Sequence, residues 1–202
     1  MTNRRHRSSK REGFTLIEVM LAAGLIMFGA VGIMALQQAA IRGNRQARQI
    51  TAATEISLAW VERLQRQSVA WTSATVGGTQ DVPYLTAIAN QPLSSGWFVP
   101  TLPTNATQNE YPGRDWAGLE NGDPTRWRYC TLVNLTWLNN FTSMRADVIT
   151  WWPKEGMADQ AVFPNCGIGA NGAAIVAAIQ QANSPLHSVA ASTVLRWNPV
   201  VQ

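Results

Sequence analysis

The sequence contains few of the residue types that build metal centres and active sites. Its 202 residues include two cysteines, Cys130 and Cys166, two histidines, and no Cys-x-x-Cys pair. Zinc and iron–sulfur sites need such ligands in clusters with short spacings. The sequence also shows no serine–histidine–aspartate pattern and no paired carboxylates of the kind that support catalysis. We therefore expect a protein that is not an enzyme and that binds no metal and no cofactor.

Most of the chain also lacks an excess of charge of either sign. The formal net charge is +4, and residues 1–13 account for all of it, with five basic side chains against Glu12. The other 189 residues hold the remaining 11 basic and 11 acidic side chains. A protein that binds nucleic acid needs a broad cationic surface. The sequence therefore predicts no nucleic-acid partner.

A long apolar run follows the basic segment. Residues 14–36, FTLIEVMLAAGLIMFGAVGIMAL, contain a single charged side chain, that of Glu18. As a helix rising ~1.5 Å per residue, this run spans roughly 34 Å, which is enough to cross the core of a bilayer. The basic residues before it favour a cytoplasmic N-terminus, and no convincing small-residue cleavage site follows it. The run is therefore interpreted as a retained, single-pass membrane anchor.

Glu18 is unusual because it lies within this apolar run. A carboxylate there costs about 2.5–3.5 kcal/mol on insertion scales, so such residues are usually kept where they have a partner. The alternative is a glutamate that extends its side chain toward the membrane surface near the start of the helix. The apolar pattern alone leaves both interpretations open.

Residues 13–19, GFTLIEV, follow a short basic leader and resemble the signature of type IV pilins and pseudopilins. The resemblance implies that residues 1–13 form a leader, which a prepilin peptidase removes by cleaving between Gly13 and Phe14. It also implies that the new amino terminus of Phe14 is methylated. Glu18 then becomes the fifth residue of the mature chain and sets the axial register of subunits in a filament, where its carboxylate meets a terminal amine in a water-poor core.

The resemblance extends along the anchor to residues 29–37, GAVGIMALQ, which look like the anchor of minor pilins of the PilV type. Major pilins usually carry a proline in this stretch, and this chain has none there. Gly24, Gly29 and Gly32 would allow local unwinding or close helix approach, although small residues that merely face lipid are the alternative.

A minor pilin of this type is implied to help prime the assembly of a type IV pilus and to enter it near the tip, for motility or adhesion. The implied partners are other minor pilins, the major pilin, a tip adhesin, the prepilin peptidase and the inner-membrane assembly platform. Before assembly the protein would span the inner membrane with its C-terminal region in the periplasm, and afterwards it would lie in the pilus at the cell surface. The alternatives are a pseudopilin of a type II secretion system, a major pilin, or a membrane-anchored enzyme or ligand-binding protein.

The anchor is expected to continue as an amphipathic helix through residues 37–71. One stripe of this helix should face a folded domain; it comprises Ile50, Ala53, Trp60, Leu64 and Trp71, with Ser57 and Gln67 as polar gaps. Residues 72–125 contain many prolines and glycines and predict a long connection, with short strands near 82–88 and 97–99.

Residues 126–202 carry the strongest strand pattern. Alternating side chains over 126–137 and 144–152 predict an antiparallel hairpin, and the residues VITWW at 148–152 resemble the late strands of PilV-type proteins. A short helix is expected over 171–181 and a last strand over 189–197. If this region lies outside the cytoplasm, one disulfide between Cys130 and Cys166 is expected, with two buried thiols as the alternative. The predicted fold class is α+β, a long N-terminal helix on an antiparallel sheet of about four strands.

Overall fold

The computed structural model describes residues 13–71, 83–88, 93–101, 111–138, 142–154, 164–169 and 171–196. The first twelve residues of the predicted leader lie outside these ranges. The chain divides into two compact units, residues 1–47 and residues 48–202.

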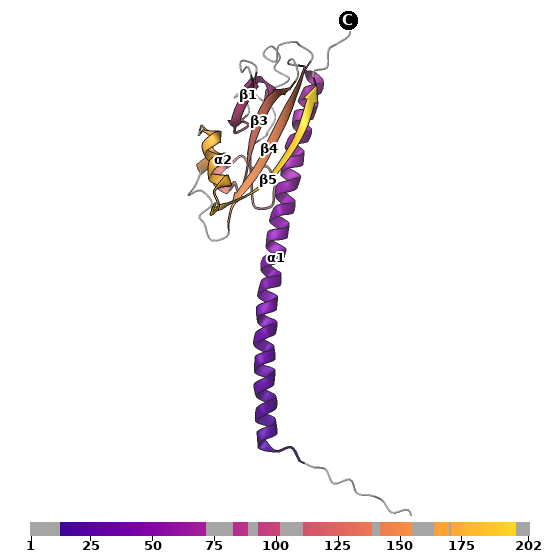
Figure 1. Ribbon diagram of the computed structural model, residues 1–202, viewed down its shortest axis with the longest axis vertical. Coiled ribbons are helices and arrows are strands. Elements are labelled where there is room, and N and C mark those ends of the chain that lie inside the picture. The colour runs from indigo at the N-terminus through magenta and orange to yellow at the C-terminus, as the bar shows by residue number, and fades with distance from the viewer. Residues whose placement is uncertain are drawn as a thin grey trace, which may run out of the picture. The chain divides into compact units, whose positions relative to one another are not determined.

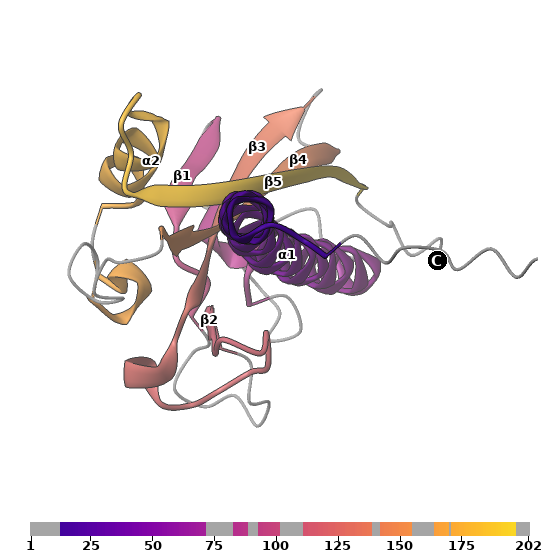
Figure 2. The same cartoon turned by 90° about the horizontal axis from the view of Figure 1, so that it is seen from below.

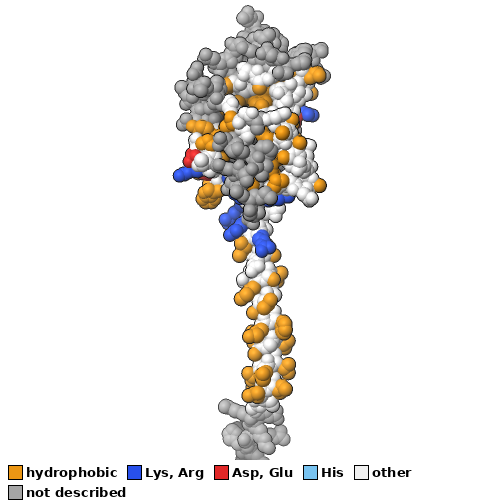
Figure 3. Space-filling view, turned by 90° about the vertical axis from the view of Figure 1, so that its left-hand side faces the viewer, with side chains coloured by type: hydrophobic (Ala, Val, Ile, Leu, Met, Phe, Trp, Pro, Cys, Tyr) orange, Lys and Arg blue, Asp and Glu red, His pale blue; other side chains and the backbone are white. Residues whose placement is uncertain are grey.

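Helix α1, Leu16–Ala70, is a single helix of 55 residues. No proline interrupts it, and Glu18 lies in its first turn, where the positive end of the helix dipole favours an acidic side chain. Its N-terminal part is long and apolar enough to cross a membrane, and none of this apolar stretch is buried within the structure. Figure 3 shows the hydrophobic side chains exposed along this part of the helix.

The unit formed by residues 48–202 contains one antiparallel sheet. The order along the main path is β1-β3-β4-β5, and β2 pairs separately with β3 (Figure 1). Long, regular pairing of β3 with β4 and of β4 with β5 forms the centre of this sheet. The strands are β1 Ser94–Phe98, β2 Gly113–Arg114, β3 Tyr129–Leu138, β4 Ser143–Pro153 and β5 Leu186–Arg196.

Four short helical segments complete the described elements. Helix α2, Gly172–Gln180, begins after Asn171, whose side chain accepts a hydrogen bond from the amide of Ala173. The 3-10 helices are η1 Leu85–Ile88, η2 Pro124–Arg126 and η4 Pro164–Gly167.

One face of the sheet is buried by the C-terminal part of α1, as Figure 2 shows. Trp60 and Leu64 of α1 are fully buried among side chains of β3 and β4. At the same interface the Ser57 hydroxyl donates a hydrogen bond of 2.8 Å to the Thr150 hydroxyl on β4. A helix packed on an antiparallel sheet confirms the predicted α+β fold class.

The opposite face of the sheet has a second buried cluster around α2. Leu132 and Trp151 from the sheet pack there with Ile175 of α2. Because successive residues of a strand point to opposite faces, β3 and β4 contribute to both clusters. The sheet is therefore covered on both sides over part of its length.

An ion network joins α1 to the segment around β2. The Glu120 carboxylate accepts a hydrogen bond of 2.8 Å from Arg114 and also forms an ion pair with Arg63 of α1. All three side chains are largely buried, so water competes little with these contacts. This network holds the 111–120 segment against the helix.

The predicted helix stripe is correct in most positions, wrong at Ile50 and incomplete at Ile56. Ile50 is 43% exposed, whereas Ile56, which was not predicted, is buried. Ser57 is not a gap, since it is fully buried and bonded to Thr150. The buried stripe is therefore wider than the pattern of large apolar residues indicated, because a satisfied hydroxyl can occupy a core position.

Several strand predictions also need correction. Residues 83–88 form a turn and η1 instead of a strand, and Leu85 and Ile88 point together into the core because side chains three apart align in a 3-10 helix. The strand predicted over 97–99 begins earlier, as β1. Alternation over 126–137 predicted that Trp127 shares a face with Tyr129, but Trp127 packs in the α2 cluster, because β3 starts only at Tyr129. The hairpin, the short helix and the last strand are confirmed.

The Ser57–Thr150 bond predicts a specific pattern of stability changes. Ser57→Ala leaves the buried Thr150 hydroxyl without its partner, and we expect a loss of about 1–3 kcal/mol in the free energy of unfolding. The matched control, Ser57→Ala combined with Thr150→Val, removes both polar groups and should recover most of that loss. Denaturant unfolding of the full chain in detergent measures both values. A double variant that is no more stable than the single one would contradict this account.

Candidate processing and assembly site

The proposed cleavage junction lies immediately before α1. Gly13, Phe14 and Thr15 precede the helix without regular structure, and the Phe14 side chain is 84% exposed. A Cβ atom added at Gly13 would meet nothing within 4 Å. The fold therefore does not itself require glycine at this position, and a requirement for it would come from another molecule that binds the junction.

Glu18 is held near the junction by Thr15. One oxygen of the Glu18 carboxylate accepts hydrogen bonds from the backbone amide and the hydroxyl of Thr15, both at 3.4 Å. Threonine at the helix start and glutamate three positions later is the spacing of a capping box, of which this structure has the glutamate half. Both bonds are long, and Glu18 remains exposed, so its carboxylate is available to a further partner. Thr15 was not among the residues predicted for this site, although its T-x-x-E spacing to Glu18 was a usable signal.

The glycines of the apolar part of α1 have no packing role within the described chain. The helix continues through Gly24, Gly29 and Gly32, and a Cβ atom added at any of them would meet nothing within 4 Å outside the helix backbone. Local unwinding at these positions is therefore not seen. Glycine in a helix costs roughly 0.5–1 kcal/mol relative to alanine. Close approach of another helix from outside the chain stays a prediction for these residues, with glycines that merely face lipid as the alternative.

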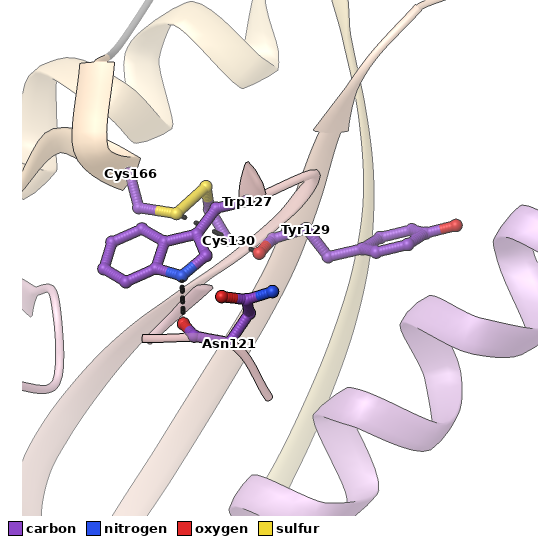
Figure 4. The surroundings of a disulfide bond; sticks show 5 residues. All are labelled: Asn121, Trp127, Tyr129, Cys130 and Cys166. Carbon is purple, nitrogen blue, oxygen red and sulfur yellow. Dashed lines mark hydrogen bonds between the residues drawn. A yellow bond between two sulfur atoms is a disulfide. The ribbon is translucent and has the colours of Figure 1, made fainter. Parts of the chain in front are cut away.

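The two cysteines form a disulfide in the unit of residues 48–202 (Figure 4). It connects Cys130 on β3 with Cys166 in η4, with 5.3 Å between their Cα atoms. The indole nitrogen of Trp127 lies nearby and donates a hydrogen bond of 2.5 Å to the carbonyl of Asn121. The disulfide therefore attaches the segment after β4 to the sheet on the α2 side.

Tyr129, next to Cys130 in the strand, points away from the disulfide toward the α1 face (Figure 4). Burial of its side chain raises the pKa of the Tyr129 phenol, although Arg128 opposes this shift. The phenol therefore stays neutral well beyond physiological pH. Across the ranges that the structure describes, no cluster of three or more histidine, cysteine, aspartate or glutamate residues is arranged to hold a metal ion.

The N-terminal residues of the chain match a known family model. A family model described as "Prokaryotic N-terminal methylation motif" matches residues 8–34, which include Gly13, Phe14 and Glu18. No curated protein and no solved structure matches the chain. The chain therefore carries the N-terminal motif of type IV pilin-like prepilin proteins. The motif and the apolar helix are consistent with membrane anchoring.

The disulfide predicts a measurable share of stability. Replacing both Cys130 and Cys166 by serine releases a loop of 36 residues, and chain entropy gives a loss of about 4 kcal/mol in the free energy of unfolding. Denaturant unfolding of the full chain in detergent, with and without a reductant, measures the difference. The reductant should destabilise the native chain and leave the double-serine variant unchanged. Equal stability of native chain and variant would contradict a structural role for the bond.

Proposed function

We propose that this protein is a minor pilin of the PilV type that helps prime the assembly of a type IV pilus and is incorporated into it near the tip. The observation that supports the proposal is the match of the N-terminal methylation motif to residues 8–34, which include Gly13, Phe14 and Glu18 and lead into an exposed apolar helix. This role is structural and needs neither catalysis nor a cofactor.

The proposed mechanism begins with cleavage between Gly13 and Phe14. Cleavage removes the basic leader and leaves a positive amine at the edge of the apolar helix. When the apolar helices of several subunits pack together, water is excluded and the dielectric falls, so the attraction between this amine and the Glu18 carboxylate of a neighbour grows. A shift in register would leave a charge buried without a partner, which costs several kcal/mol. The pair therefore selects one alignment of the subunits.

In this mechanism Glu18 exchanges its contact with Thr15 for the terminal amine of a neighbouring subunit, and the exposure of the Thr15–Glu18 contact makes this exchange possible. Among the residues that the structure describes, the Glu18 carboxylate has two hydrogen bonds, both long and both from Thr15. A terminal amine offers a charged donor, and charge-assisted hydrogen bonds are roughly twice as strong as neutral ones. Glu18 can therefore leave its local contact for the amine of a neighbour without a large loss.

The similarity of residues 29–37 and of the late strands to PilV-type proteins supports a minor pilin over a major one. The same similarity favours a pilus over a type II secretion system, whose pseudopilins share the N-terminal signature. The proposed partners are the other minor pilins, the major pilin and a tip adhesin, together with the prepilin peptidase and the inner-membrane assembly platform. The protein would span the inner membrane before assembly and lie in the pilus afterwards, serving motility or adhesion.

Processing can be tested directly at the amino terminus. We expect mass spectrometry of the protein isolated from its own cells to find a chain that begins at Phe14 and carries one added methyl group. A Gly13→Glu variant should retain all 13 leader residues, because the junction would no longer fit the peptidase. Functional protein that still begins at Met1 would refute the proposal.

The role of Glu18 needs a test that separates assembly from membrane insertion. Glu18→Ala and the isosteric Glu18→Gln should insert into the membrane normally, but their amount in sheared pili should fall at least about tenfold, the effect of ~1.4 kcal/mol. Immunoblots of membrane and pilus fractions measure both quantities. Glu55→Ala, at another exposed position of α1, is the matched control and should enter pili normally. Normal incorporation of both Glu18 variants would remove the register mechanism.

A further inference from the structure

Strand β5 is an edge of the sheet and pairs on one side only. It is bonded to β4 from Leu186 opposite Pro153 to Arg196 opposite Ser143, with no shift in register. Within the residues that the structure describes, no strand pairs with its other side (Figure 1). An edge strand presents a row of backbone N–H and C=O groups outward, which another extended chain can use.

The opposite edge of the sheet is protected. Strand β1 is only five residues long, and its pairing with β3 shifts register between Ser94 and Trp97. The start of α2 lies directly against it, since a Cβ atom added at Gly172 would be 2.0 Å from the Trp97 carbonyl oxygen. Short length, irregularity and a covering helix are common ways to block an edge. Strand β5 is long and regular, and the hydrogen bond between it and α1, from the Gln65 side chain to the Thr193 hydroxyl at 3.0 Å, joins side chains and leaves the backbone groups of its outer edge unused.

The side chains of β5 also leave its edge accessible. From Leu186 to Leu195 the strand contains no proline, lysine, arginine, aspartate or glutamate. The residues exposed on the face away from α1 are mostly small, among them Ser188, Ala190 and Ser192. A long, regular and uncharged edge is the type to which a further strand adds most readily.

Charge near the end of β5 indicates what kind of segment fits. Arg196 is exposed and is the only charged residue of the strand. The neighbouring cation on β4, Arg145, is already bonded to Asp147 at 2.9 Å. A segment with a carboxylate at the Arg196 end and no charge along its middle therefore complements this edge.

We propose that the outer edge of β5 binds an extended segment of another protein subunit, which adds to the sheet as a further strand. The segment is uncharged and rich in β-branched residues over its middle, with an acidic residue beside Arg196. Main-chain hydrogen bonds supply most of the affinity, and the terminal charge selects the segment. The proposal concerns residues 48–202 and depends neither on leader cleavage nor on entry into a filament.

The probe is a fluorescent nonapeptide of alternating threonine and valine with glutamate at both ends, so that it fits in either direction. Fluorescence anisotropy with the full chain in detergent measures its binding. We expect saturable binding that is lost when several consecutive central nitrogens of the peptide are methylated. Hydrogen exchange should slow in β5 and stay unchanged in β1. A methylated peptide that binds as well as the parent, or a parent that does not bind, would overturn the proposal.

A charge exchange tests the acidic end. A twin peptide with lysine at both ends should bind the native chain roughly twofold to fivefold more weakly than the glutamate peptide, as expected for an exposed ion pair. Arg196→Glu should reverse that preference. Arg126→Glu, at another exposed arginine outside the sheet, is the matched control and should leave the preference unchanged. An unchanged preference in the Arg196 variant would refute the assignment of the acidic residue.

Discussion

The structure depends on the removal of one apolar helical surface from water. Over its C-terminal part, α1 meets this constraint within the chain, because Trp60 and Leu64 are covered by the sheet. Over its N-terminal part the apolar side chains, from Phe14 to Leu36, are exposed throughout. Burial of apolar surface contributes about 25 cal/mol per Å², so such a stretch needs a membrane or other helices around it. One continuous helix thus has an apolar part that its own sheet buries and an apolar part that only a membrane or other helices can bury.

The placement of charge follows from the same constraint. Glu18 is the only charged residue of the apolar run, and within the described part of the chain its carboxylate accepts two long hydrogen bonds, both from Thr15. In an apolar environment this would be unfavourable unless a cation approached. The N-terminal motif supplies that cation if the chain is cut at Phe14. The proposed cleavage would supply the cation that Glu18 needs in an apolar environment. Glu18 would in turn give the new amine at Phe14 a partner of opposite charge.

The two faces of the sheet are covered by different elements, and only one of its two edges is covered. Helix α1 buries one face, while α2 and the disulfide stabilise the other, so both long central strands are fixed by side chains on either side. The β1 edge is covered, whereas β5 remains regular and uncharged along its outer side. In a domain of this size, an accessible edge of eleven residues is a ready surface for another chain.

The sequence by itself determined the elements whose signals are local. The apolar run and the absence of proline predicted α1, alternation predicted the β3–β4 hairpin, and the motif identified Gly13, Phe14 and Glu18 as the candidate site. Tertiary structure alone decided the rest. Ser57 became a core residue because Thr150 of β4 lies opposite it, and residues 83–88 form a helical turn because Leu85 and Ile88 both reach the core that way. Strand β2 has only two residues and exists through its pairing with β3. These outcomes depend on partners distant in the chain, which local periodicity does not record.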